Sequence, residues 1–482
     1  MGTQSNNVGT PSNDVGTQNT GREAFSNRLG FILISAGCAI GLGNIWRFPY
    51  IVGEYGGAAF VVIYLIFLVI LGVPIMAMEF AVGRASQKSA AKSFNVLQPE
   101  GTKWHWFKWV CIGANYLLMM FFTVVSGWMI AYVFKMAFGK FNGLSPEAIG
   151  GVFNDFLASP LEVIGWTFLV VIAGFFVCSL GLQEGVEKVT KVMMAGLCII
   201  LLILCIKSMT LKGGAEGLKF YLIPDFAKMF EGGVTGLGNA MYAAMGQAFF
   251  TLSIGISSMA IFGSYIGKER RLTGEAWNIS VLDTVTALMA GLIIFPACFA
   301  FGVEPDSGPG LVMVTLPNIF NQMVGGQIWG TLFFIFMTFA AMATVIAVFE
   351  NIIGFSMDQW GWSRKKTSLT SGIILAVLTI PCALGFNLWS DFNVPGIGGI
   401  LDLEDFIISN NILPLGSLVY VLFCVNRYGW GWKNFLLEVN TGEKGMRFPV
   451  KSYIWIKYGI PILVVIILIV GYIPKFQQWF GG

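Results

Sequence analysis

Two short stretches of the sequence carry groups that could bind a cation beside a negatively charged small molecule. GCAIGLGNIWRFPY (37–50) follows the apolar run LGFILISA, and SIGIS (253–257) interrupts another apolar segment. Glycine lowers helix stability by about 1 kcal/mol, so both stretches are expected to break a helix. A broken helix frees carbonyl oxygens, which suit a cation, and amide N–H groups, which suit a carboxylate. The two stretches are therefore predicted to bind a cation and a carboxylate.

Two carboxylates lie inside apolar segments, where they need a partner. Asp283 lies in WNISVLDTVTALMAGLIIF, and an uncompensated charge there costs several kcal/mol, so a bound cation is expected beside it. The alternative is an aspartate on a helix end that reaches the surface. Glu79 also needs a partner or a proton, and the sequence does not assign one. We find no nucleophile–base set, Walker motif or metal cluster, so no enzyme is predicted.

The composition predicts that these stretches lie inside a membrane protein. The 482 residues are 56% apolar and only 11% charged, whereas a soluble domain carries about 25% charge. Apolar runs long enough to cross a bilayer recur along the chain. The net charge of +3 therefore does not indicate a nucleic-acid partner. The predicted spans are 29–53, 58–83, 108–138, 162–181, 189–208, 238–265, 276–303, 327–357, 367–386, 399–425 and 452–474.

The distribution of Lys and Arg predicts the orientation in the cell (inner) membrane. Most of these residues fall in segments that share one side with the N-terminus, which places the N-terminus in the cytoplasm. An odd number of spans then places the C-terminus outside. Residues 1–21 are polar and are expected to form a disordered cytoplasmic tail.

The two broken segments are spans one and six, which indicates an internal repeat. Two halves of five spans each must enter the membrane from opposite sides, as in the inverted repeats of secondary transporters. The predicted fold class is an all-α polytopic membrane protein with eleven helices in a 5+5 inverted repeat, of which helices 1 and 6 are discontinuous. The alternative is that the glycines only allow tight helix packing. The predicted parts are repeat 1 (22–208), repeat 2 (209–425) with an extracellular loop helix (309–324), and span 11 with the C-terminus (426–482).

Four motifs resemble the neurotransmitter:sodium symporter family. They are GCAIGLGNIWRFPY, EYGGAAF (54–60), GVPIMAMEFAVGR (72–84) and GQAFFTLSIG (246–255), and the resemblance runs from about Arg22 to the end of the chain. The chain is similar to the bacterial eleven-span branch that carries leucine and other hydrophobic amino acids. The resemblance implies Na⁺-coupled symport by alternating access.

The resemblance also implies two Na⁺ sites. The first would use the Ala39 carbonyl, the side chains of Asn44 and Asp283, and Thr251. The second would use the carbonyls of Gly37, Ile40 and Ala340 with the Thr344 hydroxyl. The family usually has two adjacent hydroxyl or carboxylate residues in span eight, but this chain has Ala343 before Thr344, so one ligand is missing.

Chloride is not expected to be required. Many members of the family have asparagine at the position of Asp283 and bind chloride nearby. Tyr64 and Gln247 match chloride-site positions, but Ala287 stands where a serine is usual. The fixed charge of Asp283 would replace chloride.

The substrate implied is a neutral, hydrophobic α-amino acid. Family members that select amines have an aspartate where this chain has Gly41, so here the substrate would bring its own carboxylate. Two departures affect the pocket: Phe122 replaces a tyrosine, and Ser257 replaces a glycine. The implied substrate-binding residues are Ala39, Gly41, Leu42, Gly43, Leu118, Phe122, Phe250, Thr251, Ser253, Ile256, Thr344 and Val348. Plain helix packing is the alternative for the aromatic and aliphatic members.

The resemblance implies two ion-pair gates. Arg47 and Asp405 would form the outer gate, closed beneath by Phe250. Arg22 and Asp358 would form the inner gate, helped by Phe25, Tyr265 and Ser264, although simple surface charge is an alternative for this pair.

Other functions stay open at the level of sequence. A proton-coupled carrier or antiporter on the same architecture would titrate Glu79 or Asp283, and Na⁺-dependent binding would separate it from a Na⁺ symporter. A substrate-gated channel or receptor would not accumulate substrate against a gradient. The sequence does not decide which amino acid is carried, whether H⁺ or K⁺ is counter-transported, or the oligomeric state.

Overall fold

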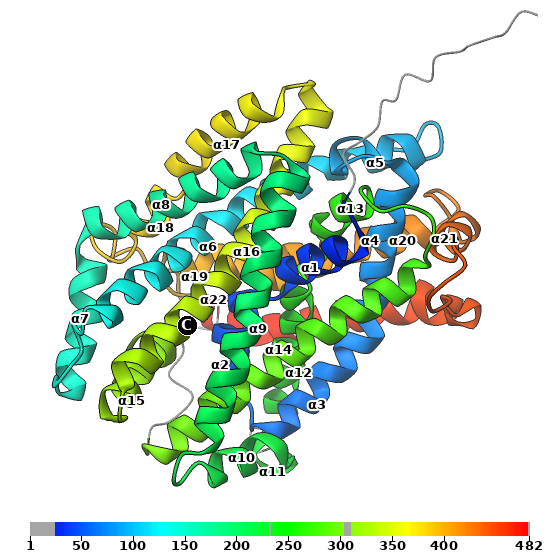
Figure 1. Ribbon diagram of the computed structural model, residues 1–482. Helices are drawn as coiled ribbons and strands as arrows, with labels where there is room; N and C mark the ends of the chain where they lie inside the picture. The colour runs from blue at the N-terminus through cyan, green and yellow to red at the C-terminus, as the bar shows by residue number, and fades with distance from the viewer. Residues whose placement is uncertain (1–24, 231–232, 303–309, 481–482) are drawn as a thin grey trace, which may run out of the picture.

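The computed structural model describes residues 25–230, 233–302 and 310–480, and this part of the chain is helical throughout, apart from loops and two isolated β-bridges (Figure 1). The predicted tail (1–21) and Arg22 lie outside the described residues. The expectation of an all-α protein is confirmed.

Long apolar helices form the body of the protein. In the described residues, nine continuous stretches are long and apolar enough to cross a membrane, and a tenth is a bent pair. The nine are Ala58–Ser86, Trp104–Ala137, Pro160–Ser179, Leu182–Met209, Leu272–Ala300, Gly326–Trp360, Arg364–Leu384, Ile400–Val425 and Val450–Gln477. They contain α3 (Ala58–Phe67), α4 (Val73–Ser86), α6 (Phe107–Ala137), α8 (Pro160–Ser179), α9 (Lys188–Met209), α14 (Leu272–Ala300), α16 (Gly326–Trp360), α17 (Arg364–Leu378), α18 (Ile380–Leu384), α19 (Ile400–Ile407), α20 (Leu413–Val425) and α22 (Ile460–Phe480).

The bent pair is predicted span one. It consists of α1 (Arg28–Ala39) and the stretch Gly43–Glu54, which contains α2 (Phe48–Glu54), and the two parts meet at 49°. Predicted span six consists of α12 (Gly233–Thr251) and α13 (Ser258–Gly263), separated by residues 252–257. Counting this interrupted helix gives the expected eleven spans, with breaks in the first and sixth, as the 5+5 repeat requires.

Proline explains a recurring irregularity of these helices. Five single turns have π-helical geometry and precede a proline by two residues: Gly43–Arg47, Leu68–Gly72, Leu311–Thr315, Ile408–Ile412 and Trp455–Gly459. Proline has no N–H to donate, and its ring collides with the carbonyl four residues earlier. The preceding turn therefore widens, which is the usual form of a π-bulge. A sixth π-turn, Leu182–Glu187, has no such proline.

Short helices on the loops extend the sequence-based prediction. The predicted loop helix at 309–324 corresponds to Leu311–Thr315 and α15 (Leu316–Gln322). Four further loop helices were not predicted. They are α5 (Ala90–Leu97), α7 (Pro146–Ala158), α10 (Ala215–Leu222) and α21 (Trp432–Val439), and the short α11 (Phe226–Phe230) follows α10. Three of the four have eight residues, too few for a strong periodic signal, whereas α7 has 13 residues and begins with Ser145 and Pro146, a start signal that could have indicated it.

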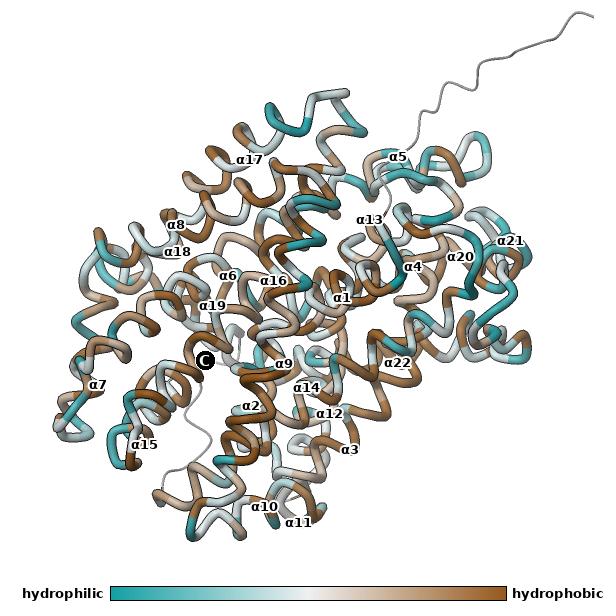
Figure 2. Tube along the Cα trace, in the orientation of Figure 1, coloured by the Kyte–Doolittle hydropathy of each residue, from teal (hydrophilic) through white to brown (hydrophobic). Residues whose placement is uncertain are grey.

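Hydrophobic residues cover the middle of the long helices. Figure 2 shows brown segments along α3, α9 and α22, whereas teal residues gather near α5 and α21 at one end and near α7 and α15 at the other. Inside this apolar surface, α1 packs on α9, α14 and α16, and α13 packs on α4. The two interrupted spans are therefore surrounded by other helices, which is where non-helical backbone at membrane depth can be tolerated.

Candidate functional site

The first break lies between α1 and the π-turn at Gly43–Arg47. Ile40 leaves the helix with φ −73° and ψ 86°, and the chain resumes a helical course at Leu42. The glycines here allow close approach of other spans: a Cβ on Gly41 would lie 2.5 Å from Oγ1 of Thr344, and a Cβ on Gly43 would lie 2.8 Å from the Phe250 ring. Any side chain at these two positions would therefore occupy space that Thr344 and Phe250 now fill.

The second break is longer and has more unusual backbone geometry. Three of its residues have positive φ: Ser253 at 51°, Gly255 at 95° and Ser257 at 68°. The left-handed region costs about 1–2 kcal/mol for a residue with a side chain, so the two serines are held there against their own preference. A side chain on Gly255 would collide with the backbone carbonyl of Leu413.

Polar groups from other spans hold the second break in place. Glu79 accepts a hydrogen bond from the Gly255 amide. Asn115 donates to the Ile256 carbonyl at 2.9 Å and accepts from Asn351 at 3.0 Å. The hydroxyls of Ser257 and Tyr420 are 2.5 Å apart. The partner that Glu79 requires is thus a backbone amide.

Asn44, Thr251 and Asp283 form one buried cluster between the two breaks. Nδ2 of Asn44 donates to Oδ1 of Asp283 at 2.7 Å. Oγ1 of Thr251 lies 2.8 Å from Oδ1 of Asn44 and 3.0 Å from Oδ2 of Asp283. A hydroxyl has only one hydrogen to donate, so this cluster holds more acceptor oxygens than donors can satisfy, which suits a cation. Three of the four predicted ligands of the first Na⁺ site are thus in contact, and Ala39 lies in the adjacent turn of α1.

A second oxygen-rich point surrounds Thr344. Its Oγ1 lies 3.1 Å from the Gly37 carbonyl oxygen, 3.3 Å from that of Cys38 and 3.5 Å from that of Ala340. Two of the three carbonyls predicted for the second Na⁺ site therefore meet the predicted hydroxyl, while no such contact is present for Ile40 in the described residues. A Cβ on Gly37 would lie 3.3 Å from the Ala343 Cβ, so the residue at the position of the missing ligand packs next to Gly37.

An apolar pocket lies beside both clusters. Nine of the predicted substrate-binding residues line it: Ala39, Gly41, Gly43, Leu118, Phe122, Phe250, Ser253, Ile256 and Thr344. Cys38 and Leu413 also line it and were not predicted. Of the other three predicted residues, Leu42 lines the adjacent outer cavity, Thr251 belongs to the polar cluster, and Val348 is buried one helical turn beyond Thr344 without lining this pocket. The volume of about 10 Å³ would admit about one water, so a substrate requires the pocket to open.

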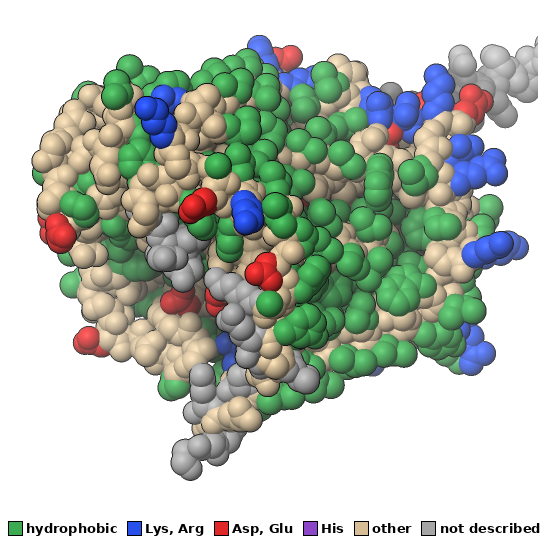
Figure 3. All heavy atoms as spheres, turned by 90° about the horizontal axis from the view of Figure 1, so that it is seen from below, with side chains coloured by type: hydrophobic (Ala, Val, Ile, Leu, Met, Phe, Trp, Pro, Cys, Tyr) green, Lys and Arg blue, Asp and Glu red, His purple; other side chains and the backbone are tan. Residues whose placement is uncertain are grey.

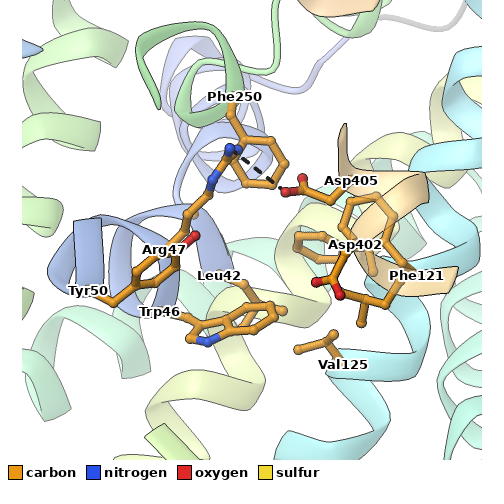
Figure 4. Close-up of a pocket in the computed structure, with 12 residues that line it drawn as sticks. Leu42, Trp46, Arg47, Tyr50, Phe121, Val125, Phe250, Asp402 and Asp405 are labelled. Atoms are coloured by element: carbon orange, nitrogen blue, oxygen red, sulfur yellow. Dashed lines mark ion pairs between the residues drawn. The ribbon is translucent and has the colours of Figure 1, made fainter. Parts of the chain in front are cut away.

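A second cavity of about 90 Å³ lies against Phe250 and contains the predicted outer gate (Figure 4). Nη2 of Arg47 is 3.8 Å from Oδ2 of Asp405, and the Arg47 guanidinium lies 4.7 Å from the centre of the Phe250 ring. Ser409 donates a 2.5 Å hydrogen bond to Asp405. Phe250 lines both cavities, so its ring is the wall between them. Six further residues line this cavity and were not predicted: Trp46, Tyr50, Phe121, Val125, Leu401 and Asp402.

The inner gate can be described only in part, because Arg22 lies outside the described residues. Asp358 accepts a 2.7 Å hydrogen bond from the Ser89 amide. The rings of Phe25 and Tyr265 meet edge to face, with centres 5.6 Å apart, and both line a cavity of about 440 Å³. Ser264 is buried and donates to the Ile261 carbonyl. Phe25 and Tyr265, two of the residues predicted for the inner gate, are therefore in contact.

The family model for the sodium:neurotransmitter symporter family matches residues 22–141 and 160–479. An uncharacterized sodium-dependent transporter of Bacillus subtilis, YhdH, is 33% identical over 92% of this chain and 96% of its own length. A human sodium- and chloride-dependent GABA transporter 2 is 24% identical over 90% of this chain and 77% of its own. The crystal structure of MhsT in complex with L-phenylalanine is similar with a TM-score of 0.84 and 37% identity, over 94% of this chain and 100% of that one.

Proposed function

Because the chain belongs to the sodium:neurotransmitter symporter family, we propose that it is a Na⁺-coupled symporter that imports a neutral, hydrophobic amino acid by alternating access. The observation that carries this proposal is the oxygen-rich cluster of Asn44, Thr251 and Asp283. It joins two helix breaks next to an apolar pocket, so one cation can contact both breaks and a substrate carboxylate together.

The two Na⁺ ions would act at different places. The first would replace the hydrogen bonds among Asn44, Thr251 and Asp283 and would be completed by the Ala39 carbonyl and the substrate carboxylate. The second would lie at Thr344 between α1 and α16, with the carbonyls of Gly37, Ile40 and Ala340. Because the substrate would complete the first site, each ligand would raise the affinity for the other by the same factor.

The pocket supports an amino acid with an apolar side chain. Gly41 provides no carboxylate for an amine, and the amides of Leu42 and Gly43, where the helical course resumes, would bind a substrate carboxylate. Leu118, Phe122 and Ile256 offer an apolar surface for the side chain. The related structure of MhsT holds L-phenylalanine, which agrees with this substrate class. The gates would be Arg47 with Asp405 outside and Arg22 with Asp358 inside.

The direct test is a scintillation-proximity binding assay on the purified chain with each of the twenty amino acids, with and without Na⁺. We expect Na⁺-dependent competition by hydrophobic amino acids. Absence of any Na⁺-dependent competitor would sink the proposal. Replacing chloride by gluconate should leave uptake unchanged, since Asp283 supplies the negative charge; loss of uptake would refute chloride independence.

The proposed orientation has the N-terminus in the cytoplasm and the C-terminus outside an inner membrane. Figure 3 supports it, since Lys and Arg gather at the edge of the molecule where Figure 1 places α5 and α21. Lys268, Arg270 and Lys444 belong to the loops at this end. Accessibility of single cysteines at residues 444 and 140 to a membrane-impermeant thiol reagent tests it: only the second should react in intact cells.

A further inference from the structure

A groove of about 410 Å³ runs between α8 and α17, away from the proposed substrate route. Phe175 forms part of its wall and is backed by Phe349 of α16, with stacked rings 3.9 Å apart. Opposite Phe175, Gly372 has no side chain to fill the space; a Cβ there would lie 3.4 Å from the ring. The groove extends along α8 from Phe168 to Ser179, roughly 16 Å at the helical rise per residue.

The two ends of the groove differ in charge. Lys365 and Ser179 line one end, whereas Phe168 and Ala376 line the other. Lys365 is the middle of three consecutive basic residues. Arg364 donates to Glu350 at 2.6 and 3.0 Å, and the Lys366 ammonium lies 4.6 Å from the centre of the Trp362 ring. Within the described residues Lys365 forms no ion pair, so its ammonium is available at the mouth of the groove.

We propose that this groove binds one anionic phospholipid, with an acyl chain along the apolar wall and the phosphate beside Lys365. The apolar length and the single cation at one end match an amphiphile whose charge is also at one end. A Lys side chain near a helix end can extend its ammonium to the headgroup level, where each basic residue contributes about 1 kcal/mol toward anionic lipid. Because Phe175 stacks on Phe349, a lipid in the groove would also stabilise the packing of α8 against α16.

Native mass spectrometry of the full chain in equal amounts of phosphatidylglycerol and phosphatidylcholine tests this site. We expect the wild type to retain phosphatidylglycerol with about fivefold preference. Lys365→Gln should abolish the preference. The matched control Lys366→Gln removes the same charge one residue away, where the ammonium lies over Trp362, and should keep it. Gly372→Leu should reduce retention of both lipids by filling the groove.

A second readout guards against variants that fold poorly. Phosphatidylglycerol should raise the apparent Tm of the wild type and of Lys366→Gln more than that of Lys365→Gln. Equal retention of both lipids by the wild type, or equal loss of preference in the two lysine variants, would overturn the proposal. A dimer that forms without phosphatidylglycerol and is blocked by Gly372→Leu would also overturn it, by assigning the groove to a second copy.

Discussion

The two helix breaks line the same pocket but differ in how the chain is interrupted. The first break spans about three residues after Ala39 and bends the chain by 49°, and none of its residues has positive φ. The second break spans residues 252–257, with three positive φ values, two of them at serines. The first break is a short interruption that glycine permits, whereas the second break holds two serines in an unfavourable backbone conformation.

The difference in geometry is matched by a difference in support. In the first break, Gly41 and Gly43 are contacted by the side chains of Thr344 and Phe250, which can move. In the second, Glu79 and Asn115 bind the backbone directly, and the backbone of α20 lies against Gly255. The surroundings of the first break can therefore adjust to a ligand, whereas the backbone of the second break is held in one conformation.

The largest effect is expected where the two breaks are joined. Asp283→Ala removes the acceptor for Asn44 and the charge that a cation would neutralise. Hydrogen bonds to charged groups contribute about 1.5–3 kcal/mol each, so Na⁺-dependent amino-acid binding should fall by more than about 100-fold. Scintillation-proximity binding measures this loss. Asp391→Ala, in an exposed loop, should bind normally; comparable loss in both variants would remove Asp283 from its role.

The next largest effect is on the stability of the fold, and it should differ between substitutions in the two breaks. Gly255→Ala places a side chain at positive φ against the Leu413 carbonyl, which cannot yield without moving α20. We expect a loss of about 2–4 kcal/mol and an apparent Tm lower by on the order of 5 °C. Gly43→Ala collides with the Phe250 ring and meets the Thr251 backbone only at an ordinary contact distance of 3.9 Å, so it should lower the Tm less and substrate affinity more. Equal loss of Tm in both variants would contradict the contrast between adaptable and fixed breaks.

A smaller effect concerns the side chain that α20 contributes to the pocket. Leu413→Ala enlarges the pocket next to Ile256 while leaving the backbone contact with Gly255 intact. The ratio of affinities should shift about tenfold from leucine toward tryptophan, within the 1–3 kcal/mol that a few methylene groups supply. Competition binding measures the ratio. Leu418→Ala, on the same helix but outside the pocket, is the control and should leave the ratio unchanged.

The smallest effect should come from the first break's oxygen-rich point at Thr344. Ala343→Ser adds a hydroxyl next to Gly37 and so supplies the missing ligand. We expect Na⁺ affinity to rise about threefold, the equivalent of a modest net hydrogen bond, as read from the Na⁺ dependence of substrate binding. Ala347→Ser, one turn further along α16, should not change it. An unchanged Na⁺ affinity in Ala343→Ser would mean that water already completes this point.

Much of the architecture could be predicted from the sequence because it depends on local properties. Apolar length gives the spans, and glycine gives the two breaks. The proline-linked π-turns are also local, and Pro49 or Pro414 could have indicated them. The contact of Asn44 with Asp283, 239 residues apart, followed only from the family resemblance.

Most of the missed residues had no distinctive chemistry in the sequence. Leu413 is one leucine among many in an apolar span, and only the fold places it at the pocket. The partner of Glu79 is the Gly255 amide, a group that every residue except proline possesses. Asn115 and Asp402 were available signals, since an amide or a carboxylate inside an apolar span usually has a binding partner.

The contact between the second break and α20 has a consequence for how substrate preference can diverge. A side chain on Gly255 would collide with the backbone of Leu413 and Ser417 in α20, and a side chain on Gly416 would collide with the backbone of Gly255. This backbone contact restricts positions 255 and 416 to glycine almost completely. The side chain of residue 413 takes no part in the contact. A single substitution at Leu413 can therefore change the shape of the substrate pocket during evolution, while the backbone contacts that hold the second break beside the ion site stay the same.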